Sequence, residues 1–452
     1  MRQNHQTAAK AQAATQTHCL RIGQAMVDIT PPLNISMCGH LEHRFEGFKD
    51  SLYANAVVFS QDRTNVCLIT ADLIGFNREF ARDVQGRIAN RLHMKPENVL
   101  LCATHTHRGP DVIWSQKSKN NIGYINRLKR NLVDLAKRAA VSLEPASVGA
   151  GVGKVSIGIN RRLKVKGAIQ FAPNPRGVYD RDVAVVKIAA AGKLKGLIVS
   201  HACHPTSEAK QVISADYPGR VRRLLQKQCG RKIFFPYLLG CCGDVRPNGP
   251  YRKGKWVPMT EIQIRTFAKT VRSVAGAIKL EKAPSLSFVH STVHLPLDPK
   301  RIPLEKLAQW YKEAKEFTHT KGVAEKNPRG RHDLLRTICT LKKSLHILKT
   351  WQKIKPIVLD VAVLRLGRIV FAFLPGEEFT EIGLQIKRLQ KGSVIIPVSL
   401  YNVMNPYICT ARACRDGGYE PDQSFAWYDA KYPFPFSGRC ERIIVDKIAG
   451  LL

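Results

Sequence analysis

The sequence has no apolar run long enough to cross a bilayer. Its longest apolar stretches, such as residues 369–374, fall far short of the roughly 20 residues that a membrane-spanning helix needs. Residues 1–18 are polar and rich in Ala and Gln, without the apolar segment of a secretory signal. We therefore expect a soluble or peripheral protein with a loose N-terminal tail over residues 1–19 and, by default, a cytoplasmic location.

Cysteine pairs at metal-binding or disulfide-framework spacing are also missing. The 12 Cys are scattered, only Cys241 and Cys242 are adjacent, and no pair has CxxC spacing. A zinc ribbon and a small disulfide-stapled scaffold are therefore excluded, and a reducing compartment is the default interpretation.

Acidic residues are scarce beside basic ones. The chain has 71 Lys and Arg against 35 Asp and Glu, which gives a formal net charge of +36. This excess is larger than solubility requires and favours an anionic neighbour, such as nucleic acid, a lipid surface or an acidic polymer. Because no helix-turn-helix, RNP aromatic motif or Cys/His finger is present, nucleic acid is not the expected partner.

Strand-like and helix-like segments alternate along the chain, which is typical of an α/β protein. We predict a mixed β-sheet core flanked by helices, in a single large catalytic domain over residues 20–452. Strands are expected at residues 52–60, 65–71, 99–104, 183–189, 196–202, 232–239, 285–293, 357–366, 369–374 and 394–400, and helices at residues 78–93, 218–229, 261–280 and 378–389.

Residues 301–356 stand apart because they are rich in Lys and Arg. They are helical in pattern at both ends and broken around Asn327, Pro328 and Gly330, which predicts an inserted helical hairpin. Its basic face comprises Lys342, Lys343, Lys349, Lys353 and Lys355. That face is either a solvated surface or an anion site that docks the protein on anionic lipid.

Histidines lie at the ends of two predicted strands. His105 and His107 are two residues apart where a buried strand runs into a Gly-Pro turn, so both side chains can face one pocket. His201 and His204 follow another strand in the same way. Neutral imidazoles at such a place suit zinc, although hydrogen-bonded structural histidines would leave the same pattern. Glu377, after a third strand, could supply a carboxylate ligand or only a helix-start charge.

Several short blocks together resemble the N-terminal catalytic domain of the neutral/alkaline, non-lysosomal ceramidase family. They are VDITPP at 27–32, DSLYA at 50–54, TADL at 70–73, THTHRGP at 104–110, NRR at 160–162, HPTS at 204–207, SADYPG at 214–219, GDV at 243–245, PGE at 375–377, and Tyr407 with the Tyr-Glu pair at 419–420. The likeness spans roughly residues 20–440. Their order and spacing, rather than any single block, carry the resemblance.

This resemblance implies one zinc ion per chain, held by His105, His204, Glu377 and Tyr407. Tyr407 is followed by Ile-Cys-Thr where the family has two Thr, but its distance to Tyr419 fits.

The resemblance also implies that His107, Arg161 and Tyr419 face the substrate. Zinc-activated water would then cleave an N-acyl amide bond, with protonated His107 as a candidate acid for the leaving amine. Asp72 and Asp216 could orient the ligating histidines or cap neighbouring helices, and His201 is expected to be structural.

Two departures from the family pattern affect the expected substrate. Arg246 stands where the family's ceramidases carry Ser, so Arg246 could bind an anionic substrate group, point into solvent or pair with Asp244. The chain also ends at Leu452, without the family's C-terminal β-sandwich domain. We predict a zinc-dependent hydrolase of linear amides with ceramide as the best-named substrate. The alternatives are hydrolysis of another amide or ester with an anionic group, and a non-catalytic anion- or membrane-binding relative.

Overall fold

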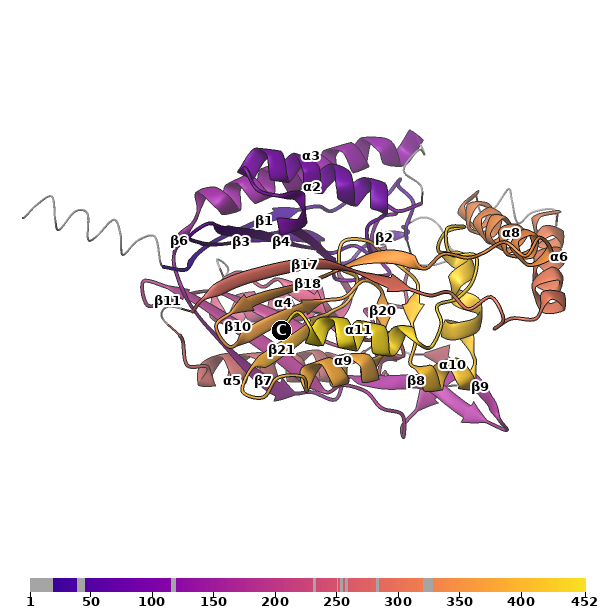
Figure 1. Ribbon diagram of the computed structural model, residues 1–452. Coiled ribbons are helices and arrows are strands. Elements are labelled where there is room, and N and C mark those ends of the chain that lie inside the picture. Colours follow the sequence, from indigo (N-terminus) through magenta and orange to yellow (C-terminus); the bar gives the residue numbers. More distant parts are fainter. Residues whose placement is uncertain are drawn as a thin grey trace, which may run out of the picture.

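The computed structural model describes residues 19–38, 45–114, 119–230, 233–249, 251–252, 255–256, 259–281, 284–319 and 328–452. The tail expected over residues 1–19 lies outside the described residues apart from Cys19. Three larger β-sheets and a set of flanking helices make up this part of the chain (Figure 1).

The five-stranded sheet has the order β5-β4-β3-β1-β6. Its strands are β1 (Arg21–Asp28), β3 (Tyr53–Gln61), β4 (Thr64–Ala71), β5 (Val99–Ala103) and β6 (Glu144–Pro145). Strands β4 and β5 are parallel and are joined through helix α2 (Arg78–Leu92), as the sequence predicted. Helix α2 starts where the Asn77 side chain accepts a hydrogen bond from the Phe80 N–H, and it ends at His93 in the left-handed conformation.

The other two larger sheets have four strands each. One sheet has the strand order β13-β11-β10-β7, with β7 (Ser147–Lys154), β10 (Asp182–Ala190), β11 (Lys193–His201) and β13 (Tyr237–Leu239). The other has the order β17-β18-β19-β21, with β17 (Leu286–Leu295), β18 (Ile357–Leu366), β19 (Ile369–Phe373) and β21 (Val394–Val398). Both contain antiparallel and parallel neighbours, so the predicted mixed β-sheet core is confirmed.

Shorter strands form small ladders around these sheets. They are β2 (Gly47–Phe48) with β12 (Val212–Ile213), β8 (Gly158–Val165) with β9 (Ala168–Asn174) and β14 (Val245–Pro247), β15 (Tyr251–Arg252) with β16 (Lys255–Trp256), and β20 (Glu377–Glu378) with β22 (Tyr407–Ile408). Predicted site residues lie on β8 (Arg161), on β14 (Arg246) and on the β20/β22 pair (Glu377 and Tyr407).

Helices cover the outer faces of the sheets, and the inner faces pack together. Helices α2 and α3 (Lys119–Val141) bury one face of the five-stranded sheet, through residues such as Phe80 and Leu132. The opposite face packs against the other two sheets, so that Val57, Val186 and Phe371 belong to one apolar cluster. Outside the basic region at residues 301–356, the structure also describes helices α4 (Asp216–Cys229), α5 (Glu261–Ala277), α9 (Thr380–Lys387), α10 (Ala411–Asp416) and α11 (Cys440–Ala449).

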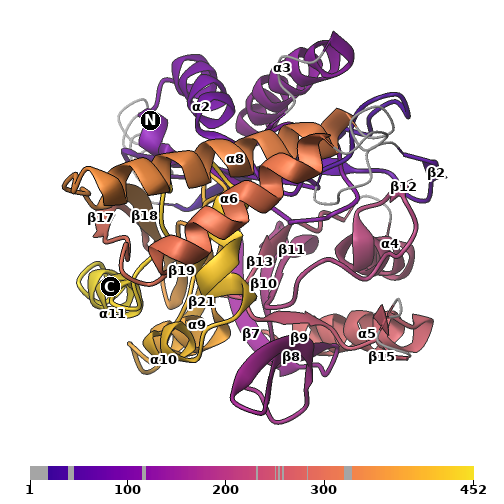
Figure 2. The same cartoon turned by 90° about the vertical axis from the view of Figure 1, so that its right-hand side faces the viewer.

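Two helices occupy the basic region at residues 301–356. Helix α6 (Leu304–His319) packs against α8 (Pro328–Lys349), and the pair lies across one face of the molecule (Figure 2). Pro328 starts α8, a favoured position for Pro, but Gly330 lies inside the helix, so the break ends earlier than predicted. Leu341 and Ser344 are buried, whereas all five Lys of the predicted basic face are exposed.

No helix among the described residues is both long and apolar enough to span a membrane. The cytoplasmic location stays a prediction from the sequence.

Candidate metal centre

His105 comes directly after strand β5 and is held in an unusual backbone conformation. Its φ of 68° lies in the left-handed region, which is uncommon for residues other than Gly. The His105 N–H donates to the Leu73 carbonyl at 2.8 Å, which fixes the turn against the end of β4. The imidazole is only 1% exposed, and its Nδ1 lies 2.6 Å from the Ile74 carbonyl.

His204 follows strand β11 and reaches the same place from the neighbouring sheet. Its Nδ1 lies 2.7 Å from the Cys242 carbonyl and 3.0 Å from the Val245 carbonyl. The His105 and His204 rings are 5.0 Å apart between centroids. The sequence expectation that the two strand ends meet is therefore correct.

Glu377 completes a compact group with these two histidines. Its Oε2 lies 3.1 Å from His204 Nε2 and 3.5 Å from His105 Nε2. Strand β20 pairs Glu377 with Tyr407 of β22 in parallel register, which brings these two side chains together from distant parts of the sequence. Gly243 is needed beside them, because a Cβ there would lie 2.5 Å from the Glu377 carbonyl oxygen.

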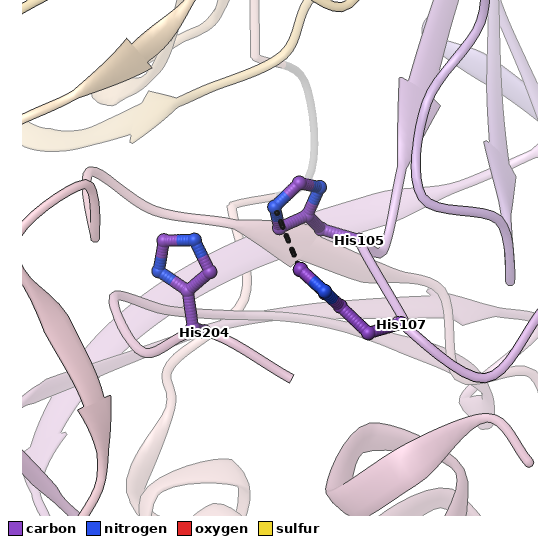
Figure 3. A group of neighbouring side chains, drawn as sticks. All are labelled: His105, His107 and His204. Atoms are coloured by element: carbon purple, nitrogen blue, oxygen red, sulfur yellow. Dashed lines mark hydrogen bonds between the residues drawn. The ribbon is translucent and has the colours of Figure 1, made fainter. Parts of the chain in front are cut away.

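His107 lies beside the group from the same loop as His105. Figure 3 shows the two rings directed toward each other, with His107 Nε2 at 3.4 Å from His105 Nε2. The potential ligand atoms of His105, His107 and His204 all lie within 4.8 Å of one another. His107 is partly exposed, unlike the two fully buried histidines.

The protonation states of this group suit a metal ion. Since Nδ1 of both His105 and His204 faces backbone carbonyls, Nδ1 carries the proton and Nε2 keeps its lone pair for a ligand. Burial and the positive charge of Arg161 lower the pKa of His204 to about 4, so this imidazole is neutral. Burial alone would raise the pKa of Glu377, but the adjacent His105 and His204 hold it well below its usual range. Two imidazoles and a carboxylate are ligands that zinc accepts.

Tyr407 lies beside this group, with its ring 6.3 Å from the His204 ring between centroids. The Arg161 guanidinium donates to the Tyr407 hydroxyl at 3.0 Å and to the Gly243 carbonyl at 2.6 Å. Burial and the charge of Glu377 raise the pKa of Tyr407 well above its usual value, and Arg161 opposes that shift. Arg161 donates hydrogen bonds to Tyr407, Gly243 and Glu420, and its contact with the substrate stays a prediction.

Glu420, the acidic member of the Tyr-Glu pair, binds two arginines of the site. Its carboxylate accepts from Arg161 Nε at 2.9 Å and from Arg162 Nη1 at 2.6 Å. All three side chains are buried. Glu420 therefore neutralises two buried guanidinium groups and fixes the one that contacts Tyr407.

Phe171 of β9 links the remaining predicted residues, and no sequence signal marked it. Its ring lies 5.9 Å from the Tyr419 ring, 4.9 Å from the Arg161 guanidinium and 6.0 Å from that of Arg246. Tyr419 is 36% exposed and Phe171 is 44% exposed. Arg246, on β14, is partly buried. These three side chains form the edge of the centre that solvent reaches.

Tyr428 is a second residue that the sequence did not reveal. Its buried hydroxyl donates a short hydrogen bond to Glu377 Oε1, the oxygen turned away from His204. Burial and the charge of Glu377 raise the pKa of Tyr428 well above its usual value, so it remains a donor. Tyr428 thus orients the Glu377 carboxylate.

Asp72 and Asp216 were expected either to orient the ligating histidines or to cap helices. Backbone carbonyls lie at the histidine Nδ1 atoms, and Asp216 occupies the start of a helix, which is the second alternative. Asp72 accepts from the Tyr53 N–H, the Thr104 hydroxyl and Arg222. Asp216 is the first residue of α4 and accepts from Ser207 and from the N–H groups of Glu208 and Tyr217.

Asp72→Asn should therefore affect stability rather than metal binding. The substitution weakens a buried ion pair with Arg222, in which Asp72 Oδ2 lies 2.8 Å from NH1. Leaving a buried cation without its counter-charge costs about 3 kcal/mol. Chemical denaturation should show a lower free energy of unfolding, with unchanged metal stoichiometry in the folded protein. Loss of metal from a folded Asp72→Asn variant would instead indicate that Asp72 orients a ligating histidine.

His201 lies outside the centre, as expected of a structural residue. Its Nδ1 is 2.8 Å from the Asp182 carbonyl, and its ring packs 5.3 Å from that of Phe267.

Residues 20–248 match the model of the neutral/alkaline non-lysosomal ceramidase N-terminal domain. The chain belongs to this family. Among curated relatives, the chain is 26% identical over 318 residues to the neutral ceramidase of Pseudomonas aeruginosa, which covers 62% of this chain and 46% of that protein. The ceramidase-family chain thus spans less than half the length of this relative.

The fold is also that of the family. The crystal structure of the neutral ceramidase from Pseudomonas aeruginosa matches 96% of this chain and 74% of its own, with a TM-score of 0.68 and 18% identity. A ceramidase complexed with C2 matches with the same figures. At this identity the likeness shows the fold alone, and it agrees with the predicted α/β class.

Proposed function

We propose that the chain hydrolyses the N-acyl amide bond of ceramide, using one zinc ion held by His105, His204, Glu377 and Tyr407. One observation carries the proposal. Three distant segments of the chain bring His105 Nε2 and His204 Nε2 to within 3.5 Å of Glu377 Oε2. Membership of the ceramidase family and similarity to a neutral ceramidase support the amide substrate.

Zinc, when bound by this donor set, would lower the pKa of a coordinated water toward about 7 and polarise a substrate carbonyl. Side chains of the protein would carry out the proton transfers. His107, partly exposed beside His105, can accept a proton at Nε2 and return it to the nitrogen of the leaving amine. Burial raises the pKa of Tyr419 to about 12, so its hydroxyl stays protonated and can donate to the oxygen where negative charge develops.

The test is metal removal and restoration with two substrates. Protein stripped by a chelator should no longer cleave a short-chain fluorescent ceramide or an N-acyl amino acid, and added zinc should restore the rate. Cleavage that persists in fully stripped protein would refute the zinc mechanism. A zinc-loaded protein that cleaves neither amide would favour the non-catalytic relative.

A second candidate substrate class is an amide with an anionic group, because Arg246 lies at the solvent-reached edge with Phe171 and Tyr419. The carboxylate of Asp244, its sequence neighbour, accepts from Asn160 and from the Thr380 N–H. Arg246→Ser should lower kcat/KM for the N-acyl amino acid by about tenfold or more and leave ceramide cleavage unchanged, since a charge-assisted hydrogen bond is lost. Arg246→Lys is the charge-retaining control. An equal effect on both amides would exclude a role in anion selection.

The exposed Lys residues of α8 and the segment after it support peripheral contact with anionic lipid. Each basic residue near such a surface contributes about 1 kcal/mol. Co-sedimentation with vesicles should increase with anionic lipid content and decrease with salt. Equal binding to neutral vesicles would contradict this contact.

A further inference from the structure

A cavity of about 570 Å³ lies between helix α8 and the body of the protein. Its walls come from the first turn of α2, from Ile113 and Trp114, from α8 and from residues 428–432. This volume is within the range of small-molecule binding sites. None of His105, His107 and His204 lines the cavity, so it is separate from the metal centre.

Much of the cavity wall is apolar. Ile113, Trp114, Leu335, Met404 and Tyr432 contribute to it. Leu335 is 42% exposed although it lies on the wall of this cavity. An aliphatic chain bound there would remove this apolar surface from water.

The charged groups of the wall differ in burial according to their sign. Arg78, Arg336 and Lys431 are partly buried, whereas the acidic residues Glu79 and Asp429 are exposed. The inner part of the cavity is thus positive. The N-terminal end of α2, at Arg78, adds to the positive potential.

Lys431 is the basic group whose surroundings most favour an anion. Its Nζ lies 4.6 Å from the centroid of the Tyr432 ring. Burial and the positive charge of Arg78 lower the pKa of Lys431 to about 8, so its charged form is destabilised. The charge of Asp429 opposes this shift, and its Oδ1 accepts from the backbone N–H of Lys431 at 2.9 Å. A bound anion would stabilise both cations.

The cavity borders the metal centre through one side chain. Tyr428 lines it, and the Tyr428 hydroxyl donates to Glu377. The indole N–H of Trp114 donates to the Tyr428 carbonyl at 3.2 Å and so fixes this wall.

We propose that this cavity binds a long-chain carboxylate, with the aliphatic chain against Trp114, Met404 and Leu335 and the carboxylate near Lys431 and Arg78. Apolar walls beside partly buried cations select an amphiphile with an anionic head group over both a neutral lipid and a small hydrophilic anion. The carboxylate could be the acyl product of the metal centre or a free fatty acid. The binding site does not depend on the proposed hydrolysis.

Calorimetric titration with dodecanoate and 1-dodecanol, below the concentration at which either aggregates, tests the charge requirement. Metal-stripped protein should bind the carboxylate at least about tenfold more tightly than the alcohol, since a charge-assisted interaction is worth that much. Lys431→Met should remove the difference, and Lys431→Arg should keep it. Lys343→Met, at an exposed position of α8, is the control for general surface charge. Equal affinity for acid and alcohol, or no effect of Lys431→Met, would overturn the proposal.

Cys339 provides a second measurement that needs no variant. This exposed thiol lies on the cavity wall, whereas most other described cysteines are buried. Dodecanoate should slow alkylation of Cys339, measured by mass spectrometry, and leave Cys229 unaffected. Unchanged alkylation at saturating dodecanoate would place the ligand elsewhere.

The two sources of carboxylate are separated by kinetics. If the cavity holds the acyl product, added dodecanoate inhibits N-acyl hydrolysis in the parent and less so in Lys431→Met. If the source is a free fatty acid, dodecanoate binds without affecting the rate. Because binding is read on metal-stripped protein, a failure of the proposed hydrolysis would not be mistaken for a failure of this site.

Discussion

His204→Ala should abolish both metal binding and amide hydrolysis while the protein remains folded. The substitution removes the Nε2 atom that lies 3.1 Å from Glu377 Oε2, one of the donors on which the centre depends. Loss of a group that merely orients a ligand reduces metal affinity by about 10- to 100-fold, and loss of the ligand itself should cost more. Metal content after dialysis and the initial rate of ceramide cleavage measure the two effects.

His201→Ala is the matched control for this experiment. His201 is also buried and lies three residues earlier, but it packs on Phe267 rather than facing Glu377. The control should lose stability and keep its metal. A His204→Ala protein that retains one zinc and full activity would contradict the assigned ligand set.

Glu420→Ala should have the largest effect on stability. The Glu420 carboxylate bridges Arg161 at 2.9 Å and Arg162 at 2.6 Å, and its removal leaves two guanidinium groups buried without their counter-charge. Breaking one buried pair costs about 3–5 kcal/mol, so the free energy of unfolding should fall by at least that amount. Because Arg161 also donates to Tyr407, any folded fraction should show a lower kcat.

Glu381→Ala is the surface control. Glu381 pairs with Arg412 at 2.9 Å and 3.0 Å, but the Arg412 side chain is 63% exposed. An exposed pair contributes about 1 kcal/mol or less. Denaturant titration should therefore separate the two variants clearly. A Glu420→Ala protein as stable as Glu381→Ala would show that the buried cluster does not stabilise the fold.

The strands and helices that could be predicted are those whose apolar residues repeat with a regular local spacing. Strand β18 and helix α2 were expected almost to the residue, because alternating or helically spaced apolar residues are bounded there by turns and caps. The stacking of the five-stranded sheet on the other two could not be foreseen, since strands buried on both faces read as plain apolar runs. The expected strand over residues 232–239 is shorter in the structure, where β13 covers Tyr237–Leu239.

The histidines were predictable because strand ends in α/β folds carry ligands. His105 and His204 indeed meet, and Glu377 joins them. The pairing of Glu377 with Tyr407 has no local signature, because a ladder of two residues leaves no pattern in the sequence. Resemblance to a family was needed to associate these positions.

The supporting contacts were the least predictable. Backbone carbonyls of Ile74 and Cys242 hold the histidine Nδ1 atoms, and every residue type offers a carbonyl, so the sequence could not distinguish them. The same limitation explains why the sequence left Asp72 open between orienting a histidine and capping a helix. Tyr428 lies 51 residues from Glu377, and Phe171 is on the strand paired with the one that carries Arg161; no sequence pattern marks either position.

Anomalous diffraction at the zinc absorption edge, on crystals of the zinc-loaded protein, locates the metal directly. We expect one anomalous peak within about 2.0–2.2 Å of His105 Nε2, His204 Nε2 and a Glu377 oxygen. The peak should disappear in crystals of His204→Ala. A zinc-loaded crystal without a peak at these atoms, or with its single peak elsewhere on the chain, would contradict the proposed ligand set.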